Sequence, residues 1–404
     1  MNRVHPPLLM ERYQGDCFLV PGPVRLAQST LSAMATPTMT ARGTEYRDVM
    51  AELNSLLRMT FNLSPSPSQR GKESWTGEDG YKIIVVSGSG TAAMEMVMAN
   101  RFSKDEKVLV PTNGKFGERV ALLGDVFAEV THLKGEWGKA FDLDEIDEIL
   151  ARGEHTALAF CHNETSSGIV QDAEALSIIA AKHGVSLILD GITSVGGLPV
   201  HPKKWKAEAV VVGAQKCTAG PSGIAAIAVS EDFIERVKAR RSKPTANPVY
   251  YLDILPALKK GGDDQTPWTP AINLAIGWVA ALRILDEETL AGRWQRCEKM
   301  AAGVRSLFSS IGLELFADKE QLSSTVTAIL YPEGINDQWR AALMEKYSTQ
   351  VIGAQDHMKG KMFRVGSMGE TPIPEMIEGC KRMIECFIDF GMEIENIDVE
   401  AHFE

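Results

Sequence analysis

The chain has 404 residues, of which 44% are hydrophobic and 24% are charged. This composition is ordinary for a soluble globular protein, and the length allows two or three structural units. The formal net charge of -11 argues against nucleic acid or an anionic membrane as the main partner, because an acidic protein repels both.

An N-terminal arm is expected at residues 1–17, and a polar, turn-rich stretch at 64–82 is interpreted as a surface insertion rather than a flap. Short apolar runs then alternate with helical stretches, as is typical of strands that are covered on both faces. We therefore expect a large α/β domain at 18–270 with a mainly parallel sheet. The expected strands are KIIVVS (82–87), KVLVP (107–111), ALAFC (157–161), SLILD (186–190), AVVVG (209–213) and IAAIAV (224–229).

Helix signals support this alternation. Between two of the strands, Asp172 is placed as an N-cap and Gly184 as a C-terminal stop. After about residue 270 the pattern changes to a long helical segment at 273–290, a second helix and a strand at 325–330. A last helix over 375–391 carries an apolar stripe. We interpret residues 271–404 as a smaller α+β domain.

Several classes of site are not expected. The N-terminus shows no signal peptide and no apolar run is long enough to span a bilayer, so we expect a cytoplasmic protein without a membrane partner. The six cysteines form no CxxC pair, which predicts reduced thiols. The histidines form no HExxH or HxxxH pair, and no metal site is predicted.

A Gly-rich turn, SGSGT (87–91), joins the first strand to a helical stretch. Glycines let the backbone approach an anion, and the free N–H groups of a helix N-terminus stabilise phosphate there. With Ala93 the turn also fits the G-x-G-x-x-A dinucleotide pattern, and a plain tight turn is a further interpretation.

Two charged residues follow buried strands. Asp190 ends SLILD, and ligands in open α/β sheets bind beyond the carboxyl ends of strands; capping of the next helix is the alternative. Lys216 follows AVVVG in GAQK (213–216). Burial lowers the pKa of a lysine and makes its amine nucleophilic, as Schiff-base chemistry requires; a solvated loop position is the alternative.

A phosphate cradle, a carboxylate for a pyridinium nitrogen and a strand-end lysine are the parts that a pyridoxal 5′-phosphate (PLP) site needs. Further motifs stand in order along residues 18–369: PGPV (21–24), ARGTEY (41–46), SGSGTAAME (87–95), TNGKFGER (112–119), HNETSSG (162–168), DGITSVGG (190–197), GAQKCTAGPSG (213–223) and FRVGSMG (363–369). In this series the chain resembles the class V, fold-type I aminotransferases of the alanine–glyoxylate and serine–pyruvate group.

The resemblance implies a fold-type I structure with a seven-stranded sheet and PLP as cofactor. It implies that Lys216 forms the Schiff base and moves the proton at the substrate Cα, while Asp190 keeps the pyridine nitrogen protonated. Phe116 is implied to stack on the ring, with an ordinary core position as the alternative. The other implied cofactor contacts are Ile192 on the opposite face of the ring, Thr165 near its hydroxyl, and Ser89, Gly90, Thr91 and Gln215 at the phosphate.

Arg364 matches the arginine that binds the substrate carboxylate, for which a planar guanidinium is suited; a surface salt bridge is the less favoured alternative. Gly22 is implied to line the substrate end through its backbone. Thr269 resembles a threonine that reaches the phosphate of a neighbouring subunit, which implies a homodimer with shared active sites; a turn role is the alternative. Ala41 and Ser367 replace histidines of the pattern, which bears on specificity and leaves the cofactor chemistry intact.

The implied reaction is ping-pong transfer of an amino group from alanine, serine or aspartate to a 2-oxo acid such as glyoxylate or pyruvate. An aminoethylphosphonate-type transaminase, or another PLP reaction on this scaffold, stays open because arginine binds phosphonate as readily as carboxylate. A desulfurase is disfavoured, since no cysteine lies between Cys297 and Cys380. A nicotinamide-dependent oxidoreductase leaves Lys216 and Arg364 unexplained, and a non-catalytic scaffold leaves the retained cofactor residues unexplained.

Overall fold

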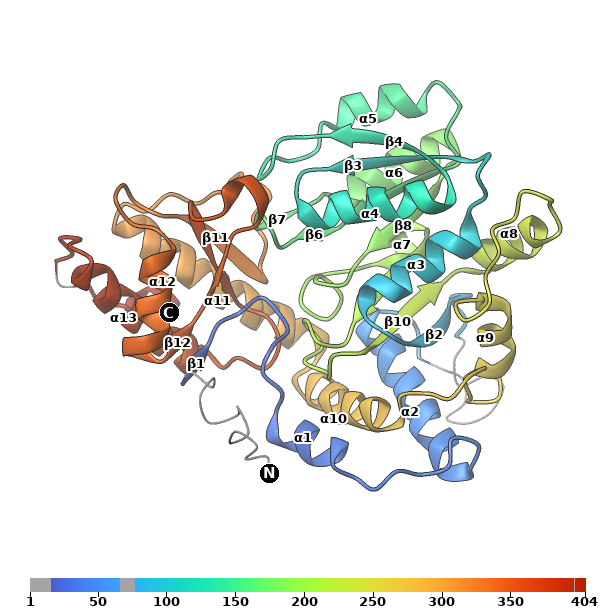
Figure 1. Cartoon of the computed structure of the whole chain (residues 1–404), viewed down its shortest axis with the longest axis horizontal. Helices are drawn as coiled ribbons and strands as arrows, with labels where there is room; N and C mark the ends of the chain where they lie inside the picture. The colour runs from blue at the N-terminus through green and yellow to red at the C-terminus, as the bar shows by residue number, and fades with distance from the viewer. Residues whose placement is uncertain (1–15, 66–76, 396) are drawn as a thin grey trace, which may run out of the picture.

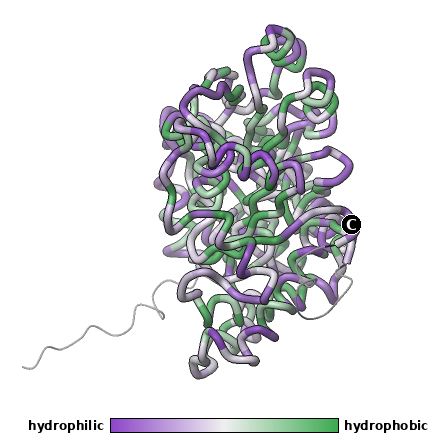
Figure 2. The backbone as a smooth tube through the Cα atoms, turned by 90° about the vertical axis from the view of Figure 1, so that its right-hand side faces the viewer, coloured by the Kyte–Doolittle hydropathy of each residue, from purple (hydrophilic) through white to green (hydrophobic). Residues whose placement is uncertain are grey.

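The computed structural model describes residues 16–65, 77–395 and 397–404. Most of the expected N-terminal arm, and the middle of the 64–82 stretch, lie outside the described residues. In Figure 1 the elements built on the large sheet form one side of the molecule, and those from helix α11 onward form the other. Hydrophobic segments run through the interior, whereas hydrophilic ones lie mostly in the outer loops (Figure 2).

The large sheet has seven strands in the order β2-β10-β9-β8-β5-β3-β4. Strand β10 is antiparallel to both its neighbours, and the other pairs are parallel, so the sheet is mainly parallel as predicted. Each of the six predicted apolar runs forms one of its strands. The strands are β2 (Lys82–Ser87), β3 (Lys107–Thr112), β4 (Glu129–Lys134), β5 (Ala157–Cys161), β8 (Ser186–Asp190), β9 (Ala207–Gly213) and β10 (Ile224–Val229).

Edge strand β4 was not predicted. Its sequence EVTHLK contains three charged or titratable side chains, and none of its residues is fully buried. The strand pairs with β3 along its whole length, from Glu129 beside Lys107 to Lys134 beside Thr112. Backbone pairing with a buried neighbour, rather than an apolar pattern of its own, therefore keeps this segment extended.

Helices cover both faces of the sheet (Figure 1). Alternate strand side chains enter two hydrophobic clusters, so that Val210 and Val212 lie in one and Val211 in the other. The predicted caps of α6 are confirmed: the carboxylate of Asp172 accepts from the N–H of Ala175, and Gly184 is left-handed. The helices are α1 (Gln28–Met34), α2 (Thr44–Thr60), α3 (Gly90–Arg101), α4 (Lys115–Phe127), α5 (Leu143–Leu150), α6 (Ala173–His183), α7 (Pro202–Trp205), α8 (Glu231–Arg241), α9 (Ile254–Gly261) and α10 (Ile272–Glu288).

The C-terminal part contains a three-stranded antiparallel sheet in the order β11-β14-β13. Its core is aromatic, with the Trp339 and Phe387 rings stacked at 4.2 Å between centroids. The elements are α11 (Leu290–Ser310), β11 (Val326–Leu330), α12 (Asp337–Tyr347), β12 (Thr349–Gln350), β13 (Ile352–Gly353), η2 (Asp356–Met358), β14 (Met362–Gly366), α13 (Ile373–Asp389) and η3 (Glu400–Phe403). The short strands β6 (Asn163–Glu164) and β7 (Ile169–Val170) pair with each other.

Two long-range contacts connect the N-terminal segment with later parts of the chain. Strand β1 (Cys17–Phe18) pairs in parallel with β12, and Leu19 lies in the C-terminal core. Helix α10 packs against α1 and α2, and its Trp278 lies in the cluster on one face of the large sheet. The domain boundaries expected at residues 17 and 270 stay a prediction.

No helix in the described part of the chain combines the length and the apolar character needed to cross a membrane.

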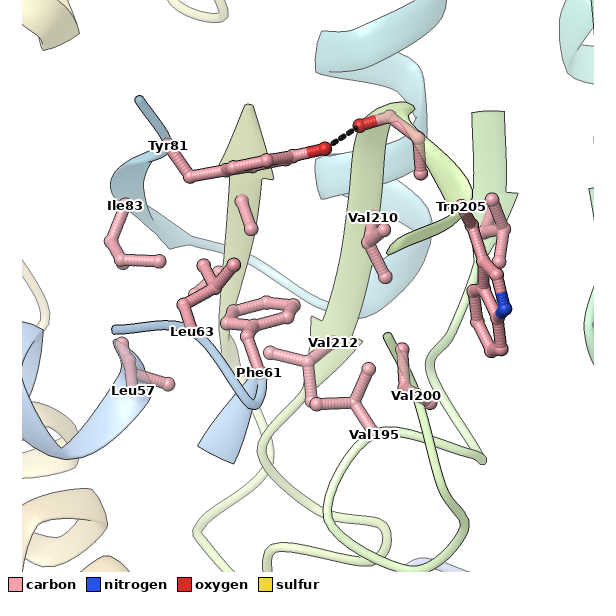
Figure 3. Packing of buried hydrophobic residues seen from close by; sticks show 14 of the residues in the cluster. Leu57, Phe61, Leu63, Tyr81, Ile83, Val195, Val200, Trp205, Val210 and Val212 are labelled. Atoms are coloured by element: carbon pink, nitrogen blue, oxygen red, sulfur yellow. Dashed lines mark hydrogen bonds between the residues drawn. The ribbon is translucent and has the colours of Figure 1, made fainter. Parts of the chain in front are cut away.

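The described ends of the 64–82 stretch are surface loop only in part, which corrects the expectation: Pro65 and Glu78 are exposed, but other side chains enter the interior. Tyr81 is buried in the large core and donates a hydrogen bond to the carbonyl of Ala207 at 2.6 Å (Figure 3). The carboxylate of Asp79 pairs with the guanidinium of Arg58 at 2.7 Å, and both side chains are buried. Arg58 also donates to the carbonyls of Ser64 and Tyr81. One buried guanidinium on α2 thus holds both flanks of residues 66–76.

We expect Asp79→Asn to destabilise the protein by about 3–5 kcal/mol, because it leaves the buried Arg58 without its counter-charge. Burial works to raise the pKa of Asp79, but hydrogen bonds from Ser64 and Arg58 outweigh it, so the pKa lies below its usual value. The stability from this group is therefore present above about pH 4 and is lost as the pH falls further. Denaturant titration measures the change. Glu174→Gln, in the exposed pair with Lys204, is the control, and an equal loss in both variants would contradict the prediction.

Candidate active site

A cavity of about 250 Å³ lies beyond the carboxyl ends of β5, β8 and β9, beside the N-termini of α3 and α4. This is the edge at which ligands bind in open α/β sheets. Eight of the sequence-predicted site residues meet there, and four others join them. The cavity is lined by Pro23, Ser89, Gly90, Thr91, Phe116, Arg119, Cys161, Asp190, Ile192, Thr193, Gln215 and Lys216.

The N-terminus of α3 forms one wall of the cavity. Ser89 is its N-cap residue, and no side chain of the described residues caps the helix, so its first N–H groups are free to bind an anion. A Cβ at Gly90 would lie 2.5 Å from Cδ1 of Ile192, so glycine is required for Ile192 to pack this closely. Oε1 of Gln215 is buried and has no hydrogen-bond partner among the described residues. The free N–H groups at the start of α3 suit a phosphate at this end.

Asp190 presents a buried carboxylate at the end of β8. Its Oδ1 accepts from the N–H of Ile192 at 3.0 Å, the one hydrogen bond that the described residues make to this carboxylate. Burial raises the pKa of Asp190 to about 6. A carboxylate in this state gains from a cationic N–H partner, and a protonated pyridine nitrogen is such a partner.

Lys216 follows β9 in the turn between β9 and β10. Its Nζ donates to the carbonyls of Pro21 at 2.9 Å and Gly22 at 3.2 Å, both on the N-terminal segment. A Cβ at Gly22 would lie 2.3 Å from Cδ of Lys216, and φ there is +84°, so the close approach needs glycine. Burial, aided by the charges of Arg364 and Arg119, lowers the pKa of Lys216 to about 8. The predicted nucleophilic lysine therefore has the required environment.

Phe116 stands in the first turn of α4, which Glu164 caps from a distant segment. The buried Glu164 carboxylate accepts from the N–H groups of Phe116 at 2.9 Å and Gly117 at 2.8 Å. The guanidinium of Arg119 lies 4.8 Å from the centre of the Phe116 ring and donates to Oγ1 of Thr91. Glu164 and Arg119 were not singled out from the sequence. Both stand in motifs quoted for the resemblance, which was the signal available.

Arg364 lies on β14, and its surroundings differ from those of a surface ion pair. The side chain is buried, and it donates to the carbonyls of Gly353 and Thr165. No carboxylate of the described residues forms an ion pair with it. Three of the five N–H donors of a guanidinium are used in this way, which leaves two for a ligand. Burial lowers the pKa of Arg364 to about 10, so the group stays charged at neutral pH.

Four predicted residues lie outside the cavity wall. Thr165 is buried and uses its carbonyl for Arg364. Thr269 lies in a separate cavity of about 30 Å³ with Ser87 and Trp268, so it does not meet Lys216 within one chain. Its implied contact with a neighbouring subunit stays a prediction, as does the ring-hydroxyl contact of Thr165. The carbonyl of Gly22 accepts a hydrogen bond from Lys216, and the charge of Arg364 helps to lower the pKa of Lys216.

The two departures from the family pattern are placed as follows. Ser367 is buried and donates from its hydroxyl to the carbonyl of Ser324 at 2.8 Å. Ala41 is half-buried in the turn before α2. Neither lines the cavity around Lys216. Their effect on specificity stays a prediction.

Comparisons with known proteins identify the family to which the chain is similar. Residues 72–353 match the family described as Aminotransferase class-V. An uncharacterized aminotransferase of Methanocaldococcus jannaschii is 33% identical over 388 residues, which is 95% of each chain. The soluble hydrogenase 42 kDa subunit of Anabaena cylindrica is 30% identical over 380 residues, 93% of this chain and 94% of that one.

A solved structure gives the same result. The alanine–glyoxylate aminotransferase of Nostoc sp. superposes with a TM-score of 0.83 at 28% identity, covering 96% of this chain and 97% of that one. The predicted fold-type I architecture is thereby confirmed. The chain belongs to the class-V aminotransferases, and its cofactor is pyridoxal 5′-phosphate.

Proposed function

We propose that the protein moves the amino group of a small amino acid, such as alanine, serine or aspartate, to a 2-oxo acid such as glyoxylate or pyruvate. The observation that carries the proposal is the meeting of Lys216, Asp190 and the uncapped N-terminus of α3 in one cavity. Arg364, which the described residues hold through carbonyls alone, lowers the pKa of Lys216 by its charge. Relatives named for alanine, serine and L-aspartate as donors and glyoxylate as acceptor support this range of substrates.

The cofactor, when bound, supplies a ring that withdraws electrons from the amino acid Cα. Asp190 holds the proton on the ring nitrogen, because its buried carboxylate lacks any other cationic partner within hydrogen-bond distance among the described residues. Phe116 and Ile192, which both line the cavity, would pack against the ring. The N–H groups at Ser89–Thr91, with Gln215, bind the phosphate.

Lys216 acts as the base and acid at the substrate Cα. A pKa of about 8 lies close to neutral pH, where an amine both accepts and returns a proton efficiently. Its two carbonyl partners, Pro21 and Gly22, form no covalent or ionic hold, so the side chain is free to exchange them for the cofactor. Lys216 stands only a few residues after the end of β9, and this position keeps its amine at the cavity.

Arg364 binds the substrate carboxylate. Its planar guanidinium retains two N–H donors, which matches a bidentate carboxylate contact and fixes the direction of the Cα–H bond. Burial excludes water from this contact and strengthens it. The carbonyls of Gly353 and Thr165 hold the guanidinium in place before the substrate arrives. Substrate recognition thus requires an amino acid or a similar small anion.

A half-reaction assay tests the function. We expect alanine, serine or aspartate to convert the bound cofactor from its aldehyde to its amine form, and glyoxylate or pyruvate to reverse the change, as followed by absorbance. Lys216→Ala removes the proton-transfer group and should slow the step by about 10²–10⁴-fold. No conversion with any small amino acid would overturn the proposal. Faster conversion by 2-aminoethylphosphonate would favour the phosphonate alternative.

Replacing Arg364 by lysine should lower kcat/KM for the amino acid by about 10²-fold, because a charge-assisted hydrogen bond contributes about 1.5–3 kcal/mol and lysine loses the bidentate geometry. Steady-state kinetics measures the effect. A simple alkylamine without a carboxylate serves as the control substrate, since its slow turnover should be the same in both proteins. Equal losses for the amino acid and the alkylamine would contradict the role of Arg364.

The cofactor-free chain should show the lowered pKa of Lys216 directly. Because burial disfavours the ammonium form, labelling of Lys216 by an amine-selective reagent should rise with pH through a midpoint near 8. Surface lysines should rise near their ordinary pKa of about 10.4. Peptide mass spectrometry resolves the sites. A midpoint for Lys216 that coincides with the surface lysines would rule out a desolvated amine.

A further inference from the structure

One buried arginine outside the cavity ties the Lys216 turn to two other segments. Arg293 lies in the first turn of α11, and its side chain has no exposed surface. Its Nη1 donates to the carbonyl of Cys217 at 2.9 Å, and its Nη2 pairs with Glu370 at 2.7 Å. Its Nε pairs with Glu288 at the end of α10. A single guanidinium therefore joins three parts of the chain that are far apart in sequence.

The carbonyl of Cys217 belongs to the peptide between Cys217 and Thr218, one residue beyond Lys216. Within its own turn this segment is held by neutral hydrogen bonds, from the N–H of Lys216 to Gly213 and from the N–H of Ala219 to Lys216. The bond from Arg293 is charge-assisted and buried, and such bonds are about twice as strong as neutral ones. It therefore restrains the backbone directly after Lys216.

The second partner, Glu370, lies four residues beyond the end of β14, the strand that carries Arg364. Met368 of the same connection packs with Cys217 and Val24 in a small buried cluster. The Lys216 turn and the segment after Arg364 thus meet at one junction, with apolar side chains on one side and the Arg293–Glu370 pair on the other.

A neighbouring arginine gives a natural comparison. Arg296 also pairs with Glu288, and it donates to the carbonyls of Gly369 and Thr371. It makes no hydrogen bond to the Lys216 turn. Arg293 and Arg296 therefore share a carboxylate and a connecting segment, and differ in the bond to Cys217.

We propose that Arg293 is a positioning residue for transamination, which holds the backbone at Cys217 and through it keeps the amine of Lys216 over the cavity. The inference rests on the proposed role of Lys216. Arg293 does not line the cavity, so its effect falls on the proton-transfer step rather than on substrate binding.

The experiment compares Arg293→Lys with Arg296→Lys in the PLP-loaded enzyme. An ammonium cannot span three partners, so Arg293→Lys frees the Cys217 carbonyl while the positive charge is kept. We expect kcat to fall by about 10–100-fold with little change in KM, and the visible circular dichroism of the bound cofactor to lose intensity. Arg296→Lys should retain both kcat and the dichroism. Thermal unfolding of the two variants controls for a general loss of stability.

Equal behaviour of the two variants, or an unchanged dichroism in Arg293→Lys, would overturn the inference. If Arg293→Lys does not fold, Glu370→Gln replaces it, since that change weakens the pairing of Arg293 and should lower kcat and the dichroism in the same direction. An unaffected Glu370→Gln enzyme then counts against the inference. Failure of borohydride to trap the cofactor on Lys216 in the parent enzyme would instead refute the proposed function.

Discussion

The ammonium of Lys216 is half-buried and has no carboxylate ion pair among the described residues, and the site is organised around this constraint. Desolvation of an unpaired charge costs several kcal/mol, so the amine stays charged less readily and its pKa falls to about 8. The backbone carbonyls of Pro21 and Gly22 accept hydrogen bonds from this amine. They come from the N-terminal segment, which must cross to the carboxyl edge of the sheet for the amine to be satisfied.

The parallel sheet brings the remaining groups to the same edge. Cys161 and Asp190 are register partners at the ends of β5 and β8, and β9 ends one turn before Lys216. The helices that follow β2 and β3 begin at this edge, so their positive N-terminal ends face the cavity. This edge therefore suits an anionic cofactor, whose phosphate the backbone N–H groups would hold.

The buried arginines Arg293 and Arg364 differ in whether a carboxylate neutralises their charge. Arg293 is paired with Glu288 and Glu370, which makes it a fixed part of the framework. Arg364 is equally buried but is held by carbonyls alone among the described residues, so its charge remains available to a substrate anion. Burial and residue type are the same in both cases. The difference lies in which partners the fold brings to each guanidinium.

The sequence by itself determined the features that depend on local pattern: the buried strands, the caps of α6, the Gly-rich turn, and the strand-end positions of Asp190 and Lys216. Those features can be predicted because the pattern of buried side chains and the helix caps each depend on residues only a few positions apart. Only the tertiary structure decided the pairing of β1 with β12, the edge strand β4, the capping of α4 by Glu164, and the bond from Arg293 to Cys217. Each of these contacts joins two segments that are distant in sequence, and the residue pattern of neither segment predicts the contact. The placement of Thr269 apart from Lys216 was decided in the same way, because the fold directs its segment to another cavity.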